Sequence, residues 1–403
     1  MPGAKGGPLL PVQEAIDQLL AAANPLQETE RLPLTAALGR VLAHPVTATV
    51  NVPPADNSAM DGYALRHADW PGSDAVLPVG LRIPAGQPPG TLPPGEAARI
   101  FTGAEKPVGA DTVVMQEHTR ESKDGVVIEK LPAVGANIRP RGQDIRNGQE
   151  ILPAGKRLRA QELGLLASTG QGEVEVVRKL RVAIISNGDE LVEPGRELAP
   201  GQIFNSNRYL LQGLLDGWGF ETVDLGIAPD DPEAIADLFA AAAGQADVIL
   251  SSGGVSVGEE DHVKAVVERL GALDLWKIAM KPGKPLAFGR VADTPFIGLP
   301  GNPASALVTT LVIGRPFLFA RQGRAKTQVD PVLLPAGFSQ AGSPRQEYLR
   351  VRRAGDVLAR YDNQSSGVLL SACWGDGLAV QAPDTAIGEG DPVPYLSYEA
   401  LMG

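Results

Sequence analysis

The chain of 403 residues has a single cysteine, Cys373. One cysteine cannot form a disulfide within the chain, and it cannot build a zinc site without a different set of ligands. Buried free cysteines are common, and nothing near Cys373 in the sequence supplies metal partners. We therefore expect a protein of a reducing compartment, the cytoplasm.

The sequence also lacks a hydrophobic leader and an uninterrupted membrane span. Its first ten residues, MPGAKGGPLL, contain no apolar segment of the signal-peptide kind. The longest late apolar run, ALVTTLVIGRPFLFA, is broken by Arg315 and Pro316. The sequence predicts a soluble, cytoplasmic protein with no membrane partner.

Positive charge is scarce overall. The chain has 36 lysines and arginines against 47 acidic residues, a net charge of −11. A broad surface for nucleic acid is therefore not expected, and an anionic ligand would need local basic residues. The 47 glycines and 35 prolines lie between apolar segments, which indicates turns and β-structure and not disorder.

The length indicates roughly two to four domains. Apolar residues at helical spacing predict a helix over 12–23, with a second helical turn around 32–43, and helical spacing returns over 156–170. Between them, short β-rich runs alternate with proline and glycine turns. We predict a mostly helical, elongated domain over 1–52 and 146–178, with a β domain inserted over 53–145.

From Leu180 the pattern changes to strand, loop and helix. The strands RVAIIS, TVDLGI and DVILSS are each followed by a polar loop and a helical segment, which predicts a parallel α/β domain over 179–327. Ligands of such sheets bind outside the carboxyl ends of the strands, so the three loops should cluster. Acids occur in every one of these loops: Asp189, Glu190, Asp230, Asp231, Glu259, Glu260 and Asp261.

The segment VILSSGGVSVGEED, residues 248–261, combines a buried strand with a glycine-rich turn and three acids. Its small residues could form a backbone cradle for a phosphate or a pterin-sized ligand. We assign Ser252, Gly253, Gly254, Ser256 and Gly258 to that cradle. The acids beside it would suit a hard cation such as Mg²⁺. An ordinary glycine turn with Asp261 as a helix cap explains the same residues.

Basic residues follow downstream. Lys277, Lys281 and Lys284 lie on a strand and turn with apolar flanks, which favours contact with a buried anion over a solvated surface. In GLPGNPAS, the start of a helix after Pro300, Gly301 and Asn302 offers a second anion site, although a well-capped helix has the same residues. Asp231 is favoured as a helix cap over a ligand.

The last 76 residues, 328–403, contain short strands separated by turns and predict a small β-barrel or sandwich. Four arginines gather there: Arg345, Arg350, Arg352 and Arg353. They could help to hold an anion, but exposed charges on strand edges are the default explanation.

Seven motifs then carry a family resemblance: DNSAMDGYA, IFTGA, GQDI, NGDEL, SSGGVSVGEED, KPGKP and GLPGNPAS. In order and spacing they resemble the molybdopterin molybdenumtransferases of molybdenum-cofactor synthesis, the MoeA family, which includes the carboxyl-terminal part of gephyrin. The resemblance covers nearly the whole chain. One departure is in SNGDE, residues 186–190, where the family more often has threonine before the glycine.

The resemblance implies a four-domain, elongated subunit: multidomain α/β plus β, with an adenylyltransferase-like parallel α/β domain and a carboxyl-terminal β-barrel. It implies a homodimer whose site lies between the α/β domain of one subunit and the inserted domain of the other. The pathway adenylyltransferase and molybdenum-enzyme acceptors are possible further partners.

The implied reaction joins molybdate to adenylylated molybdopterin with Mg²⁺-dependent release of AMP. The resemblance makes Asp61, Thr102, Asp144, Glu190, Asp230 and Asp261 catalytic, with Glu190, Asp230 and Asp261 at the metal. The three lysines would neutralise anionic charge, and Arg350 is carried over from the final domain. Alternatives are a molybdopterin adenylyltransferase, a nicotinamide-nucleotide amidohydrolase, or a non-catalytic pterin-binding or scaffold protein. The two enzymes share only the region from about Leu180 to Ala325.

Overall fold

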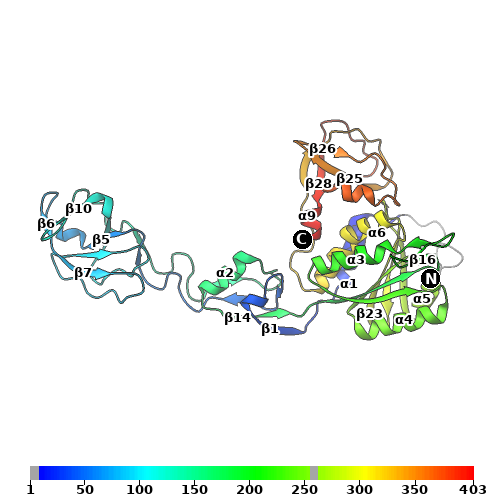
Figure 1. Ribbon diagram of the computed structural model, residues 1–403, viewed down its shortest axis with the longest axis horizontal. Coiled ribbons are helices and arrows are strands. Elements are labelled where there is room, and N and C mark those ends of the chain that lie inside the picture. The colour runs from blue at the N-terminus through cyan, green and yellow to red at the C-terminus, as the bar shows by residue number, and fades with distance from the viewer. Residues whose placement is uncertain (1–8, 255–261) are drawn as a thin grey trace.

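The computed structural model describes residues 9–254 and 262–403. Figure 1 shows an elongated molecule with a β-rich unit at one end, a smaller unit around α2 and β14 in the middle, and an α/β lobe at the other end. A second β-rich unit, around β25 and β28, stands on the α/β lobe. The chain passes through the middle unit twice, on its way out to the distant β unit and on its way back.

The distant unit is the inserted β domain. Its main sheet has the order β7-β8-β5-β9, with smaller sheets β10-β11-β6 and β12-β4. Alternate residues of the main sheet face opposite sides: Ala64 and Val113 join one buried cluster, and Tyr63 and Val114 join the other. Its strands are β4 (Asn57–Ser58), β5 (Gly62–Leu65), β6 (Val76–Leu77), β7 (Val79–Ile83), β8 (Ala97–Ile100), β9 (Thr112–Met115), β10 (Thr119–Ser122), β11 (Gly125–Ile128) and β12 (Ile138–Arg139).

The middle unit differs from the mostly helical prediction. It has the sheet β1-β14-β2, the pair β13-β3 and the helix α2 (Ala160–Ser168). The predicted second helical segment forms a 3₁₀ turn (Leu34–Ala36), and Gly39 then takes a left-handed backbone (φ +77°) that stops a helix. The strands are β1 (Thr29–Pro33), β2 (Val41–Leu42), β3 (Val46–Thr47), β13 (Glu150–Leu152) and β14 (Glu173–Val177).

The first helix, α1 (Val12–Ala22), also belongs elsewhere than predicted. Its buried face, which includes Ile16 and Leu19, packs in the core of the α/β lobe and not in the middle unit. Helical spacing predicted the helix correctly, but spacing does not say which sheet an apolar face will cover.

Glu162 anchors the start of α2. Its carboxylate accepts hydrogen bonds from the backbone N–H of Arg159 at 3.0 Å and from the guanidinium of Arg159 at 2.7 Å, and Lys156 lies 3.4 Å away. Chiefly because of the hydrogen bond from the Arg159 side chain, and despite burial, the pKa of Glu162 falls to about 2. The ionised carboxylate therefore stabilises the folded state.

Replacement of Glu162 by glutamine is expected to lower the melting temperature at neutral pH. Because the folded pKa is below the ordinary value of 4.5, this stabilisation is present above pH 4.5 and is lost as the pH falls towards 2. The Arg159 partner is exposed, so a loss on the order of 1 kcal/mol is expected. Thermal unfolding of both proteins between pH 7 and 2 should show the difference shrink; a constant difference would contradict the assignment.

The α/β lobe is built on a sheet of order β18-β15-β19-β23-β22-β20. The first four strands are parallel, as predicted, but β22 is antiparallel to both of its neighbours. Only Ala292 and Asp293 separate β22 from β23, too few residues for a parallel crossover. The strands are β15 (Arg181–Asn187), β18 (Glu221–Ala228), β19 (Val248–Ser252), β20 (Gly271–Lys277), β22 (Pro285–Val291) and β23 (Thr294–Leu299).

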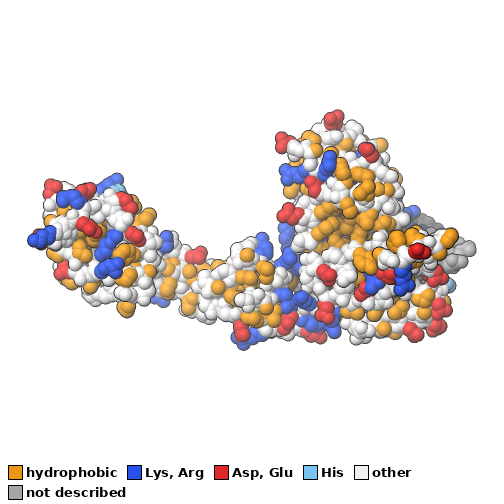
Figure 2. Space-filling model, in the orientation of Figure 1, with side chains coloured by type: hydrophobic (Ala, Val, Ile, Leu, Met, Phe, Trp, Pro, Cys, Tyr) orange, Lys and Arg blue, Asp and Glu red, His pale blue; other side chains and the backbone are white. Residues whose placement is uncertain are grey.

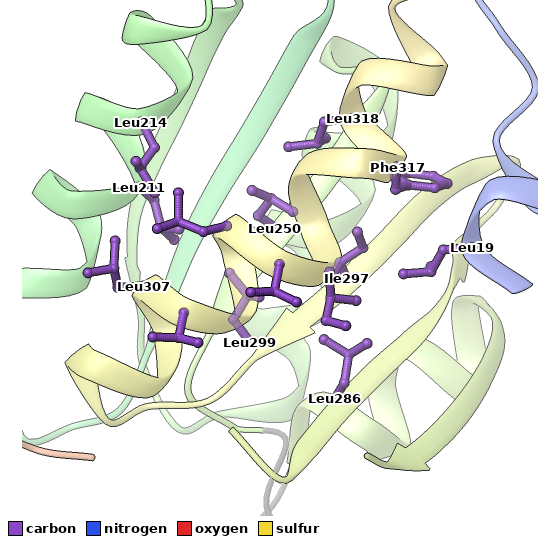
Figure 3. Close-up of a cluster of buried hydrophobic side chains, with 14 of the residues drawn as sticks. Leu19, Leu211, Leu214, Leu250, Leu286, Ile297, Leu299, Leu307, Phe317 and Leu318 are labelled. Atoms are coloured by element: carbon purple, nitrogen blue, oxygen red, sulfur yellow. The ribbon is translucent and has the colours of Figure 1, made fainter. Parts of the chain in front are cut away.

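Helices cover both faces of this sheet. One face carries α1, α3 (Ser206–Gly217) and the helical segment that starts with α6; the other carries α4 (Pro232–Gln245) and α5 (His262–Leu270). Figure 3 shows Leu211 and Leu214 of α3 approaching Leu250 and Leu299 of the strands. The three helices predicted after β15, β18 and β19 are all present. This burial fixes the strand ends that carry the polar loops.

Residues Pro303–Arg321 form a continuous helical segment that runs through Arg315 and Pro316, where the apolar run was expected to break short of a membrane span. A π-helical stretch (Thr310–Gly314) joins α6 (Pro303–Thr309) to α7 (Arg315–Arg321), and Pro316 sits in the first turn of α7. By length and composition this segment could cross a membrane, but 83% of its apolar window is buried inside the protein, as in a core helix.

The carboxyl-terminal unit is a small barrel. Its sheet runs β21-β25-β27-β28-β24, β26 pairs with β25, and a bridge between Ala336 and Leu358 closes the ring. Strand β21 comes from the α/β lobe, so the two units share a sheet. The elements are β21 (Met280–Lys281), β24 (Val332–Pro335), β25 (Gln346–Ala354), β26 (Val357–Arg360), β27 (Gly377–Gln381), β28 (Pro392–Ser397), α8 (Leu370–Trp374) and α9 (Tyr398–Met402). Cys373 is exposed and not buried.

Charged side chains gather where the middle unit meets the α/β lobe (Figure 2). Arg178, between β14 and β15, pairs with Glu28 and donates to Asp247 at 2.7 Å. Burial opposes ionisation of Asp247, but hydrogen bonds from Arg178 and the backbone of Arg181 keep its pKa below the ordinary value. These ion pairs fix the segment between β14 and β15 against the α/β lobe.

The two remaining short strands, β16 (Leu191–Val192) and β17 (Ile203–Phe204), form a parallel pair after β15.

Candidate functional site

A cavity of about 990 Å³ lies at the carboxyl ends of β15, β19 and β23. The α/β lobe forms most of its wall, and the barrel contributes Arg345 and the loop 364–366. The predicted site residues found on its wall are Glu190, Asp230, Ser252, Gly253, Gly254, Lys281, Lys284, Pro300, Gly301 and Asn302. The prediction that the polar loops after the parallel strands cluster is therefore confirmed.

Asp230 is the best-anchored acid of this cavity. Its carboxylate accepts a hydrogen bond from the Asn187 side chain at 2.8 Å. Its backbone N–H donates to the Asp189 carboxylate at 3.0 Å, and the Asp189 N–H points back at Asp230 at 3.4 Å. This reciprocal pairing joins the loops after β15 and β18. The neighbouring acid, Asp231, caps α4 through the N–H groups of Glu233 and Ala234, as the sequence predicted.

Glu190 is exposed on the cavity wall. The place that a Cβ would take at Gly188 is filled by the Glu190 carboxylate, so glycine is required for the carboxylate to fold back over the turn. Two carboxylates therefore face one cavity from neighbouring loops. Hard oxygen donors of this kind suit Mg²⁺, which proteins commonly hold through one or two carboxylates plus phosphate oxygens.

Among residues 9–254 and 262–403, no group of three or more His, Cys, Asp or Glu side chains could hold a metal ion. The buried Oδ1 of Asn187, beside Asp230, also has no hydrogen-bond partner in those residues. The donors Glu190 and Asp230 fit a cation that takes its remaining ligands from water and an anionic ligand. Asp261, the third predicted metal ligand, lies outside the described residues, as do Ser256, Gly258, Glu259 and Glu260.

Gly253 and Gly254 line the cavity directly after β19. Both have left-handed backbones, with φ of +87° and +68°. A Cβ at Gly253 would stand 2.6 Å from the Asn187 carbonyl oxygen, and a Cβ at Gly254 would stand 2.5 Å from Val263. Side chains are therefore excluded on steric and conformational grounds, as the predicted backbone cradle requires.

Replacement of Gly253 by alanine is expected to lower the melting temperature, because the new Cβ would both strain the backbone and press on Asn187. A loss of about 1–3 kcal/mol is expected. Gly244 provides the matched control: it is an exposed helical glycine with free space around its Cβ position, so alanine there should stabilise by up to about 1 kcal/mol. Equal melting temperatures for the two variants would contradict the crowding at Gly253.

The basic side chains of the cavity come from two units. Lys281 and Lys284 flank the turn between β21 and β22, and Arg345 precedes β25. Lys281 donates to Glu347 at 2.9 Å, and Arg345 donates to the Met280 carbonyl at 3.3 Å. Lys277 is exposed at the end of β20 and is not on the cavity wall, so the structure brings together two of the three predicted lysines.

Arg350 is not an anion ligand of the cavity in this structure. It is 1% exposed and absent from the cavity wall. Its guanidinium donates to the Ser371 hydroxyl at 3.0 Å and to the carbonyls of Tyr348 and Ser365, both at 3.2 Å. Burial lowers its pKa. Because Ser365 lines the cavity, Arg350 acts as a support for the wall, which the exposed-edge and the ligand interpretations both missed.

Asn302 keeps its predicted place before Pro303 at the start of α6, but its side chain makes no capping hydrogen bond. The carbonyl of Gly301 accepts a hydrogen bond from Asn207 at 2.8 Å, so α3 and α6 begin side by side at the cavity. This leaves the Asn302 side chain available to the cavity.

Asp61, Thr102 and Asp144 lie in the inserted domain, which stands at the opposite end of the molecule from the α/β lobe (Figure 1). Asp61 accepts hydrogen bonds from the backbone N–H and the hydroxyl of Thr102 at 2.7 and 2.8 Å. The backbone hydrogen bond, then the hydroxyl, lowers the Asp61 pKa. Asp144 is exposed. One chain does not bring these residues to the cavity.

Several cavity residues were not among the predicted site residues: Asn187, Phe204, Asn205, Ser206, Asn207, Gln364, Ser365 and Ser366. Arg345, for which the sequence favoured an exposed strand edge over an anion contact, does lie on the cavity wall. The run NSN after β17 was a usable signal, because it follows a strand and opens a helix, a common place for ligand contacts. Loop 364–366 gave no local signal. It reaches the cavity only through the packing of the barrel on the lobe.

Three family models match most of the chain. Residues 10–170 match the MoeA N-terminal region, residues 183–320 match a probable molybdopterin binding domain, and residues 335–398 match the MoeA C-terminal region. The adenylyltransferase and amidohydrolase alternatives are not favoured, because a shared α/β domain would leave the first and last matches unexplained.

Curated relatives and solved structures agree with these matches. A molybdopterin molybdenumtransferase of Haemophilus influenzae is 42% identical over 80% of each chain, and one of a Nostoc species is 45% identical over 74% of this chain and 71% of its own. A crystal structure of a molybdopterin biosynthesis MoeA protein from Pyrococcus horikoshii is 31% identical, with a TM-score of 0.81 over 97% of this chain and 99% of its own. The chain therefore belongs to the molybdopterin molybdenumtransferase (MoeA) family of molybdenum-cofactor biosynthesis.

Proposed function

We propose that this chain transfers molybdate to adenylylated molybdopterin with release of AMP, and that it needs Mg²⁺ to do so. The observation that carries the proposal is the cavity that combines two carboxylates, a glycine cradle and basic residues from two units. A reaction between two anions needs charge neutralisation and positioning more than a protein nucleophile.

The described residues divide this work by their chemistry. Gly253 and Gly254 leave room for a phosphate or pterin against the backbone, and Lys281, Lys284 and Arg345 supply positive charge. Glu190 and Asp230 would hold Mg²⁺, which lowers the cost of bringing phosphate and molybdate together. Asp261, Ser256 and Gly258 are proposed to complete the cradle and the metal site.

We also propose a cytoplasmic homodimer. Asp61 and its partner Thr102 are exposed at the far end of the chain, and the pKa of Asp61 is low, so a carboxylate is held ready on that surface. In a dimer this surface, with Asp144, would face the cavity of the second subunit. An adenylyltransferase that supplies the substrate and molybdenum enzymes that accept the product are the proposed transient partners.

The test uses the purified full chain with adenylylated molybdopterin. AMP release is expected to require both molybdate and Mg²⁺, and removal of Mg²⁺ with a chelator should stop it. AMP release that is absent, or that is independent of molybdate, would contradict the proposal. Sedimentation of the same sample tests the dimer: a monomer with full activity would exclude a shared site.

A further inference from the structure

A buried carboxylate lies behind the cavity wall, on the barrel strand β25. Glu347 is 3% exposed and is not on the cavity wall itself. Its Oε1 accepts a hydrogen bond from the Lys281 ammonium group at 2.9 Å. Lys281 has a half-exposed side chain that does line the cavity. A cavity cation is therefore tied to an acid that no anionic ligand can reach directly.

The backbone places this pair. Strand β21 pairs with β25 in parallel register, with Met280 opposite Gln346 and Lys281 opposite Glu347. The N–H of Gln346 donates to the Ala279 carbonyl at 2.9 Å, which extends the pairing. Lys281 belongs to the α/β lobe and Glu347 to the barrel, so the ion pair also links the two units at the cavity.

Stability alone does not explain a carboxylate at this position. Taking Glu347 out of water costs energy that one half-exposed lysine repays incompletely, and an apolar side chain of similar volume would often be at least as stable. A lysine has four rotatable bonds, and an unrestrained ammonium group samples many positions. A fixed partner reduces this freedom.

We infer that Glu347 is a positioning residue of the reaction: through its ion pair it holds the Lys281 ammonium group against the barrel, in the place where a bound molybdate or phosphate oxygen meets it. The pair lowers the charge that Lys281 offers, so binding is weaker but better oriented. The inference rests on the proposed function for the identity of the anion.

The test is a double-mutant cycle between Glu347 and Lys281. The variants Glu347→Gln, Lys281→Met and the double variant are compared for kcat and for the KM of molybdate in AMP release. Glu347→Gln is expected to lower kcat about tenfold, within the cost of a misplaced group, without raising the KM. In the Lys281→Met background the same change should have no further effect, and Glu347→Asp should restore part of the loss.

Lys284 provides the matched control, because it lines the same cavity beyond the turn. Glu347→Gln should keep its full effect on kcat in a Lys284→Met background. An equal loss of kcat in the Lys281→Met background would overturn the inference and move the role of Glu347 to Arg350, whose guanidinium also feels its charge. Unchanged kcat in Glu347→Gln would overturn it too.

Two further measurements distinguish the positioning role from a role of Glu347 in folding and from failure of the proposed reaction. The melting temperature of Glu347→Gln should stay near that of the parent, and a large drop would assign Glu347 to folding. Calorimetric titration with molybdate alone repeats the cycle without turnover, and here Glu347→Gln should bind at least as tightly. If the parent releases no AMP but the titration shows the coupling, the proposed reaction fails and the positioning role stands.

Discussion

Replacement of Asp230 by alanine is expected to reduce molybdate-dependent AMP release by about a hundredfold or more, because it removes both the anchor of a loop and a proposed metal donor. The Asp230 carboxylate accepts from Asn187 at 2.8 Å and lies beside the N–H of Asp189. Without it, the buried Asn187 side chain loses its partner. Initial rates measured against Mg²⁺ concentration should show that excess metal does not restore turnover.

Asp231 provides the matched control, because it is the adjacent acid and its carboxylate caps a helix. It caps α4 through the N–H groups of Glu233 and Ala234, so Asp231→Ala should cost about 1 kcal/mol of stability and leave the rate near that of the parent. Asp230→Asn keeps the volume and one acceptor oxygen and should remain slow. A parental rate in Asp230→Ala would remove Asp230 from the reaction.

Much of the α/β lobe could be predicted, because its strands and helices differ in period and its loops follow parallel strands. Asn187, Asp230 and Ser252 line one cavity because the carboxyl ends of parallel strands lie at the same edge of the sheet. The antiparallel β22 was missed, since a strand's direction depends on the length of its connections and not on its own residues.

The parts of the site that come from the barrel were harder to predict. Arg345 and Ser366 reach the cavity because β21 pairs with β25, a contact between segments about 65 residues apart that leaves no periodic trace. Arg350 was singled out by resemblance, but its role follows from burial, which only the packed structure shows. Family motifs identify candidate site residues, but only tertiary contacts show whether such a residue contacts the ligand or supports the cavity wall.

Replacement of Arg350 by methionine is expected to lower both stability and turnover. Methionine fills much of the volume but leaves the carbonyls of Tyr348 and Ser365 and the hydroxyl of Ser371 without their donor. Buried acceptors that lose a charged donor are costly, so the free energy of unfolding should fall by about 3 kcal/mol and the melting temperature should drop. Arg350→Lys should recover only part, because an ammonium group cannot reproduce the guanidinium fork.

The expected kinetic defect follows from the same hydrogen bonds. The Gln364 side chain accepts from the Arg350 backbone N–H and donates to the Arg350 carbonyl, both at 2.9 Å, and these two bonds remain in the variant. The Arg350 guanidinium donates to the Ser365 carbonyl, so its loss releases the next residue of the wall segment 364–366. Arg353→Met, an exposed position on the same strand, should change stability by no more than about 0.5 kcal/mol and leave the rate unchanged. If Arg350→Met is folded at the assay temperature and turns over at the parental rate, loop 364–366 does not need the support of the Arg350 side chain.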